Sequence, residues 1–574
     1  MTAKRAADTL AGMKYARCAS RTAFLTLSLL AVCAAGNPPP GNAPLGGSTA
    51  RLDYPAGAFG HYLAGRFAAA QADPGTAARE LARAVELDAN EPALTEQAFV
   101  AALAAEQPEA TALARLIPDN QIAQLVLAGE DMRAGRWDAA EKIYHALPRE
   151  GLTQLLQPLL IAWAQQGSGK TDAALETLRP FAENPRFRGI FAEHAAMIAD
   201  LANRRAEATR YYEMVAGGAA DTNLRLAQVL ASWMARNGQA DLAQQLLTAV
   251  ADRSPEIRIA LPDLVTHLQD RPVDSVNDGV AESYVALAAA LRANDQNELS
   301  LLMLHLAFRA RSDFSAARLL AEEIHISEKH YALALQEVEA IPQRDPLIAM
   351  ARLRRAALLA QLEHSDQAME LLHSMLTDYP DSALPDIQLG DVLRVKRRFG
   401  DAIAAYTKAI GRIDIPQKSD WGVFYSRGVA FERAGKWPLA EADLKMALQL
   451  FPGQPFVLNY LGYTWADMGR NLPEARTMIQ AAAIARRNDG AVTDSLGWVM
   501  FRMGDVASAV SALERAVELE PEDPTITDHL GDVYFAAGRK LEARYEWKRA
   551  LTLNPTPEDA VKIETKLSNG QPAP

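Results

Sequence analysis

A lysine-containing loop near residue 170 has the spacing of a nucleotide-binding motif. Residues 164–171 read Ala-Gln-Gln-Gly-Ser-Gly-Lys-Thr, which matches the relaxed form of a phosphate-binding loop. Such a loop follows a β-strand, and its backbone amides surround a phosphate at the start of a helix. Residues 155–166 have a helical pattern instead, and Gly169 falls where an inter-helix turn is expected. We therefore expect an ordinary turn here and no bound nucleotide.

Two histidines in the middle of the chain could bind a metal ion. His325 and His330 flank Glu328, and Glu322 and Glu323 lie just before them. The spacing differs from the His-Glu-x-x-His pattern of a zinc helix, and no third ligand is evident. We therefore expect a solvated helix end that holds no metal.

An aspartate–histidine pair, Asp528-His529, lies beside Gly531. The sequence offers no serine or cysteine that would complete a catalytic triad with it. The residues after Pro555 leave no room for an appended catalytic domain. We therefore expect no catalytic residue and no cofactor, and we expect the protein not to be an enzyme.

Charge and cysteine content exclude further classes of partner. The 574 residues carry a formal net charge of −12, which disfavours nucleic acid as a partner. The same charge repels anionic lipid head groups, so we expect membrane attachment only through an anchor. The two cysteines, Cys18 and Cys33, lie in the first 33 residues. The rest of the chain thus has no thiol that could form a disulfide or bind zinc.

The N-terminal residues are typical of an export signal. Lys14, Arg17 and Arg21 precede an apolar stretch at residues 23–35. A basic segment followed by about a dozen apolar residues is the pattern of a secretory signal peptide. The stretch is shorter than the ~20 residues that span a bilayer. The sequence therefore predicts a signal peptide at residues 1–33.

Two ways of processing this signal remain open. Residues 30–33 read Leu-Ala-Val-Cys and resemble the lipobox of bacterial lipoproteins, in which the cysteine is lipidated, although Val32 departs from the preferred Gly, Ala or Ser. Ordinary cleavage one or two residues after Cys33 would instead leave a soluble periplasmic protein. A Pro/Gly-rich tether at residues 34–52 suits an anchored lipoprotein. Because Ala34 follows the cysteine, the resemblance implies an outer-membrane lipoprotein that faces the periplasm.

Small residues recur at a nearly constant interval in the second half of the chain. Intervals of 38, 34, 35 and 34 residues separate five glycines, Gly390, Gly428, Gly462, Gly497 and Gly531. An alanine follows twelve residues after four of them, at Ala402, Ala440, Ala509 and Ala543. The alanine of the remaining unit is one residue late, which indicates an extra residue in the turn near Asn471. This period resembles the tetratricopeptide repeat (TPR), a unit of two helices.

The pattern has a simple physical basis. A glycine on the first helix lets the second helix of the pair approach closely, and the side chain four residues after the alanine covers the seam. A second glycine in the turn ends the first helix with a positive φ. One pair cannot bury its apolar faces alone, so stacked pairs share a core. We therefore expect an all-α fold, a right-handed superhelical solenoid of about ten to twelve TPR units.

The regularity of the repeats divides the chain. Residues 53–253 form a degenerate N-terminal TPR array, and a proline-rich break follows at residues 254–277. The clearer C-terminal TPR array covers residues 278–556. Residues 557–574 read as a capping helix with a polar tail.

The TPR resemblance also indicates where a partner would bind. In such solenoids the first helix of each pair lines the concave face, at positions three before and one, four and five after the glycine. The predicted partner-binding groove contains Tyr425, Asn459, Tyr463, Asp494, Trp498, Arg502, Asp528 and Asp532. Aromatic side chains beside Arg and Asp are typical of interface hot spots. The alternative for Trp498 is that it belongs to the core. The carboxylate clamp of some TPR proteins needs Lys and Asn at these places, and we expect none here.

Two segments are more particular than a generic repeat. Residues 494–498 read Asp-Ser-Leu-Gly-Trp, and residues 528–534 read Asp-His-Leu-Gly-Asp-Val-Tyr. They resemble large proteobacterial TPR lipoproteins that include the lipoprotein adaptor of the carboxy-terminal processing protease. That resemblance implies a solenoid that binds a periplasmic protease and delivers cell-wall hydrolases to it. The alternative is a structural assembly factor for an envelope machine, such as a pilus, a polysaccharide exporter or an outer-membrane insertase.

Overall fold

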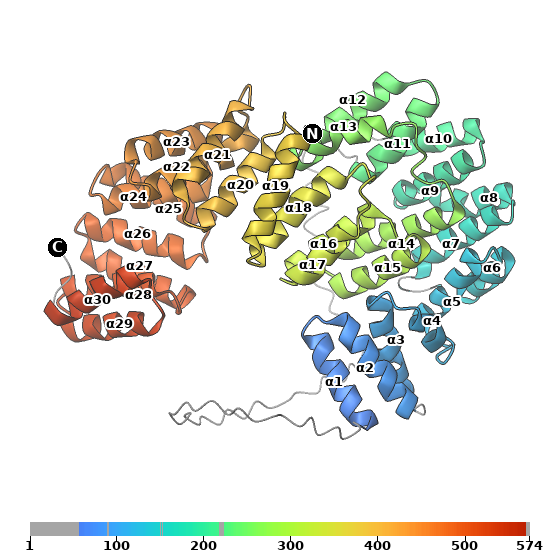
Figure 1. Cartoon of the computed structure of the whole chain (residues 1–574), viewed down its shortest axis with the longest axis horizontal. Coiled ribbons are helices and arrows are strands. Elements are labelled where there is room, and N and C mark those ends of the chain that lie inside the picture. The colour runs from blue at the N-terminus through green and yellow to red at the C-terminus, as the bar shows by residue number, and fades with distance from the viewer. Residues whose placement is uncertain (1–56, 89–90, 150, 152, 217–222, 570–574) are drawn as a thin grey trace, which may run out of the picture. The chain divides into compact units, whose positions relative to one another are not determined.

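The protein is all-helical over the part of the chain that the computed structural model describes, residues 57–88, 91–149, 151, 153–216 and 223–569 (Figure 1). The predicted signal peptide, Cys33 and the tether lie outside these residues. The helices of the first half are α1 (Ala58–Ala70), α2 (Pro74–Leu87), α3 (Pro92–Ala104), α4 (Glu109–Ala114), α5 (Gln121–Arg133), α6 (Trp137–Ala146), α7 (Thr153–Gly167), α8 (Thr171–Ala182), α9 (Arg188–Leu201), α10 (Arg205–Val215), α11 (Leu224–Arg236), α12 (Ala240–Ala251), α13 (Pro255–Thr266), α14 (Val276–Arg292) and α15 (Asn297–Ala310).

The second half continues without a change of class. Its helices are α16 (Ser315–Ser327), α17 (Tyr331–Glu339), α18 (Ile348–Gln361), α19 (Ser365–Asp378), α20 (Leu384–Val395), α21 (Phe399–Gly411), α22 (Trp421–Arg433), α23 (Trp437–Leu450), α24 (Pro455–Asp467), α25 (Leu472–Ala485), α26 (Gly490–Arg502), α27 (Val506–Leu519), α28 (Pro524–Ala536), α29 (Lys540–Thr552) and α30 (Pro557–Asn569). Within the described ranges, no helix is both long enough and apolar enough to cross a bilayer.

Consecutive helices pack as pairs, and the turn within every pair contains a left-handed residue. The φ of this residue lies between +53° and +85°. Glycine fills this position in seven pairs, at Gly135, Gly169, Gly238, Gly435, Gly469, Gly504 and Gly538. Other residues fill it in the other seven, at Ala72, Glu106, Asn203, Asp295, Lys329, Glu363 and Arg397. The described residues therefore contain fourteen helix pairs, and the expected ten to twelve is too few; α13 and α30 remain unpaired.

The seam within a pair is as tight as the repeat pattern predicts. A methyl group added at Gly497 would lie 2.7 Å from Leu513 Cγ, and one at Gly531 would lie 2.5 Å from Trp547 Cδ1. The Leu513 and Trp547 side chains are fully buried, and each comes four residues after the recurring alanine of its repeat. Real Cβ atoms do not approach other atoms this closely, so the two helices could not meet as they do with a larger residue on the first helix.

The turn of the irregular repeat also has its extra residue. The link between α24 and α25 is one residue longer than the link between α22 and α23. Two of its residues, Gly469 and Asn471, are left-handed, with φ of +65° and +47°. The second left-handed residue accommodates the added length, and Asn tolerates that conformation better than most side chains. The insertion predicted near Asn471 is therefore confirmed.

Helices from either side of residues 254–277 contact the opposite array. Beyond that segment α14 packs against α7 and α9, and α15 packs against α3 and α5. Helix α13, within it, instead packs against α18 and α20. Buried residues from 78 to 324 accordingly form one hydrophobic cluster, and those from 227 to 499 form another. Helices that follow the predicted boundary at 254–277 therefore pack against the first array, and α13 within it packs against the second array.

Ion pairs strengthen the packing of α15 and α16 on the first array. Arg318 of α16 forms a two-pronged pair with Glu106, at 2.5 and 2.9 Å, and also contacts Glu337 at 2.8 Å. Arg309 of α15 reaches Glu130 at 2.7 Å. Arg318 is buried, so loss of both carboxylate partners would leave a charge without compensation, which is strongly destabilising. These long-range ion pairs connect α15 and α16 to residues 106 and 130 of the first array.

We predict that Gly497→Leu destabilises the C-terminal repeats by about 1–3 kcal/mol, because the larger side chain overpacks the seam against Leu513. Urea unfolding should show this loss, and hydrogen exchange should become faster in residues 490–555, because solenoid stability propagates between neighbours. The matched control is Gly411→Leu, since a side chain at that exposed helical glycine meets no atom within 4 Å. Unchanged exchange in residues 490–555 of the Gly497 variant would contradict the prediction.

Candidate partner-binding surface

The eight residues predicted to bind a partner lie in register on the first helices of four successive pairs. Tyr425 comes from α22, and α24 contributes Asn459 and Tyr463. Helices α26 and α28 contribute the other five, Asp494, Trp498, Arg502, Asp528 and Asp532. We call these eight residues the first-helix row. Asp494, Trp498 and Asp532 are buried, Arg502 is exposed, and the other four are half-buried.

Burial shows that the row also connects neighbouring repeats. The Trp498 indole stacks on the His529 imidazole, with ring centroids 4.2 Å apart and an interplanar angle of 19°. Trp498 is only 9% exposed. Its apolar face therefore belongs to the contact between α26 and α28, as the core alternative predicts. Its use by a partner stays a prediction.

His529 is a buried residue of this surface that the repeat pattern did not assign to the row. Its Nδ1 donates to the Asp494 carboxylate, at 2.9 Å from Oδ1 and 3.1 Å from Oδ2. Burial alone would lower the pKa of His529, but Asp494, with Asp528 and Asp532 adding to its effect, raises that pKa above the ordinary value. Protonation of this buried imidazole, which lies between an aromatic ring and a carboxylate, is therefore favoured.

A second cation reaches the row from the last helix. Lys566 of α30 places its Nζ 2.7 Å from Asp528 Oδ2 and 2.7 Å from Asp532 Oδ2. The Lys566 side chain is 7% exposed, and Asp532 also accepts from Trp547 Nε1 at 3.0 Å. Burial raises the pKa of Asp532, an effect that Lys566 opposes. The helix predicted at 557–574 therefore does more than cover the end of the stack, because Lys566 forms ion pairs with Asp528 and Asp532 on α28.

Three residues of the row carry polar atoms that the described part of the chain leaves without a hydrogen-bond partner. These atoms are Asn459 Oδ1, Trp498 Nε1 and Asp528 Oδ1, and each is buried. Most buried polar atoms in folded proteins have a partner, so each exception needs an explanation. Atoms of this kind also occur elsewhere among the described residues, so they do not by themselves distinguish the row.

The loop with the spacing of a nucleotide-binding motif is an inter-helix turn. It follows helix α7, and Gly169 has φ of +74° at the turn position. Lys170 precedes α8 and places its Nζ 2.8 Å from Asp138 Oδ1 on the neighbouring pair. The lysine is thus an exposed ion-pair partner, and the predicted turn is confirmed.

Comparisons with known proteins agree with the repeat pattern. Residues 275–420 match a family model described as a tetratricopeptide repeat-like domain, and residues 387–455 and 495–556 match one described as a tetratricopeptide repeat. A TPR repeat-containing protein of Pseudomonas aeruginosa is 29% identical over 203 residues, which are 35% of this chain and 33% of that protein. The chain thus spans about a third of the length of that curated relative.

Solved structures with similar helical arrays are more distant. The Cut9–Hcn1 hetero-tetramer of the APC/C is 14% identical over 89% of this chain and 96% of that chain, with a TM-score of 0.39. Yeast Tom70 is 14% identical over 78% of this chain and 95% of that chain, with a TM-score of 0.33. YrrB, a TPR protein with an unusual peptide-binding site, is 19% identical over 30% of this chain and 86% of that chain, with a TM-score of 0.26.

We predict a pH-dependent stability contribution from the Asp494–His529 pair. Because the folded pKa of His529 lies above its unfolded value of about 6.5, the contribution is complete below that pH and is lost as the pH rises through the folded pKa. Asp494→Asn should therefore cost about 1.5–3 kcal/mol at pH 5.5 and less at pH 9. Urea unfolding at both pH values measures this, with the exposed Glu522→Gln as control. An equal cost at both pH values would show that His529 is neutral in the folded protein.

Proposed function

We propose that this chain, a tetratricopeptide-repeat protein that acts as a protein-binding scaffold, is an adaptor for a periplasmic protease. The observation that carries the binding role is the first-helix row, where aromatic, acidic and basic side chains align on four successive first helices and Arg502 is exposed. Trp and Arg are among the residues most often found in interface hot spots. The scaffold carries out no reaction itself.

The protease role rests on the resemblance of residues 494–498 and 528–534 to the adaptor of the carboxy-terminal processing protease. The adaptor would hold the protease and present cell-wall hydrolases to it. Such delivery raises the local substrate concentration without any new chemistry in the scaffold, because tethering turns the second encounter into an intramolecular one.

Arg502 is the best residue with which to test the binding role, because it is the exposed member of the row. Its Nη1 donates to the Asp467 carbonyl at 2.8 Å, which positions the guanidinium without burying it. A guanidinium held this way can pair with a partner's carboxylate. Its replacement should leave the fold intact, since surface substitutions usually change stability by less than about 0.5 kcal/mol.

We predict that Arg502→Ala weakens binding to the organism's carboxy-terminal processing protease by about tenfold, which corresponds to ~1.4 kcal/mol. Biolayer interferometry with both purified proteins measures this. The matched control is Arg515→Ala, because Arg515 is an exposed arginine on the second helix, α27, where it pairs with Glu518 at 2.9 Å. If both variants lose the same affinity, the first-helix row is not the specific binding surface. No binding of the wild-type chain would reject the protease and favour the assembly-factor alternative.

We further propose that the protein is an outer-membrane lipoprotein anchored through Cys33. The lipobox resemblance, the cysteine position and the following Pro/Gly-rich tether support this, and all three lie outside the described residues. The anchor would hold the scaffold on the periplasmic side of the membrane.

We predict that a clickable palmitate analogue labels the wild-type protein in cells and does not label Cys33→Ala. The reason is that lipid attachment needs the thiol of the first mature residue. Cys18→Ala is the control, because that residue lies inside the predicted signal peptide and should not affect labelling. A mature N-terminus at residue 35 or 36 without label would instead support the soluble periplasmic form.

A further inference from the structure

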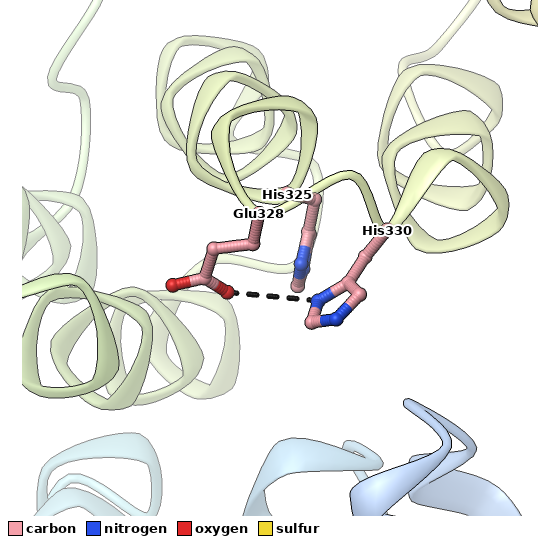
Figure 2. A group of neighbouring side chains, drawn as sticks. All are labelled: His325, Glu328 and His330. Carbon is pink, nitrogen blue, oxygen red and sulfur yellow. Dashed lines mark ion pairs between the residues drawn. The ribbon is translucent and has the colours of Figure 1, made fainter. Parts of the chain in front are cut away.

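The turn between α16 and α17 brings together two histidines and a glutamate. His325 lies in the last turn of α16, Glu328 follows its end, and His330 precedes α17. Lys329 between them is left-handed, with φ of +63°, and this tight turn directs the three side chains to one place (Figure 2). One ligand atom from each lies within 4.8 Å of the others, and Glu328 Oε2 is 3.6 Å from His330 Nδ1.

His325 does not behave as part of a solvated helix end. It is only 6% exposed, and its Nδ1 is buried without a hydrogen-bond partner. The solvated end expected from the sequence is therefore wrong for this residue.

Nearby carboxylates are already used in other contacts. Glu322 and Glu323 both pair with Arg354, at 2.6 and 3.1 Å, and Glu256 pairs with the same arginine at 3.3 Å. They therefore compensate a cation that is part of the protein. Glu328 instead has its shortest ion pair with His330, a potential ligand in its own right. Among the described residues, these three form the only group with metal-ligand geometry.

We propose that His325, Glu328 and His330 bind one divalent transition-metal ion, and that zinc is the ion they suit best. Two imidazoles and one carboxylate are a ligand set that zinc accepts, and three protein ligands leave the fourth tetrahedral position open. The Glu328 and His330 side chains are 30% and 41% exposed, so water or a partner's side chain can reach that position. The site lies in a turn between helices, apart from the first-helix row, and gives the scaffold a second chemically distinct contact point.

Metal titration of the metal-free, tag-free full-length chain tests the proposal. Isothermal titration with zinc chloride should show one ion bound per chain, and cobalt substitution should give the visible absorption of a tetrahedral site. His330→Ala and Glu328→Gln should each weaken zinc binding by about tenfold or more. Both substitutions replace partly exposed side chains, so we expect both variants to fold like the wild type. His325→Ala should have the same effect, with its fold checked by circular dichroism.

The matched control is His145→Ala. His145 lies 3.6 Å from Glu141, the same separation as in the proposed site, but no third ligand joins that pair among the described residues. Its replacement should leave zinc binding unchanged. The proposal is overturned if the wild-type chain binds no zinc, if His330→Ala and Glu328→Gln bind it as tightly as the wild type, or if His145→Ala weakens binding equally. Both cysteines stay in every variant, so a site on them would leave all variants alike and overturn the proposal too.

Discussion

Where α26 crosses α27, the backbone at Gly497 lies so close to Leu513 that a single added carbon would be 2.7 Å from its Cγ. The same contact recurs at Gly390 against Tyr406 and at Gly531 against Trp547. In these pairs the close approach lets the two helices pack together, and consecutive pairs then stack on one another. Apolar side chains between pairs then form a shared core that no pair could bury alone.

The tight seam also determines what the first helices can present. With the glycine face turned to the second helix, the residues three before and one and five after it lie toward the neighbouring pairs. The first-helix row is therefore largely structural, and Arg502 is its exposed member. Trp498 joins two repeats through His529, whereas Arg502, one turn further along the same helix, stays accessible. The buried charge of Lys566 is compensated by the Asp528 and Asp532 carboxylates, and Asp494 favours protonation of His529.

The four pairs from α22 to α29 could be predicted from the sequence, because glycine fills both the seam and the turn there. The number of repeats could not, since residues such as Glu106 and Lys329 adopt the left-handed turn without being glycine. The packing of α14 against α7 could not be predicted either, because no local pattern indicates which distant helix a given apolar face will contact.

The candidate sites show the same division between local and long-range information. The first-helix row could be placed from repeat positions, because its residues follow the glycines at fixed intervals. Lys566 could not be assigned to Asp528 and Asp532, since 34 or more residues separate them in sequence. The grouping of His325 with Glu328 and His330 depends on one left-handed residue, Lys329, whose conformation its residue type does not predict. A photoreactive benzoylphenylalanine placed at Arg502 in cells would test most directly whether the row holds the partner. The account predicts a crosslink to a periplasmic protein from position 502 and none from position 515 on α27, whereas a crosslink from position 515 alone would contradict it.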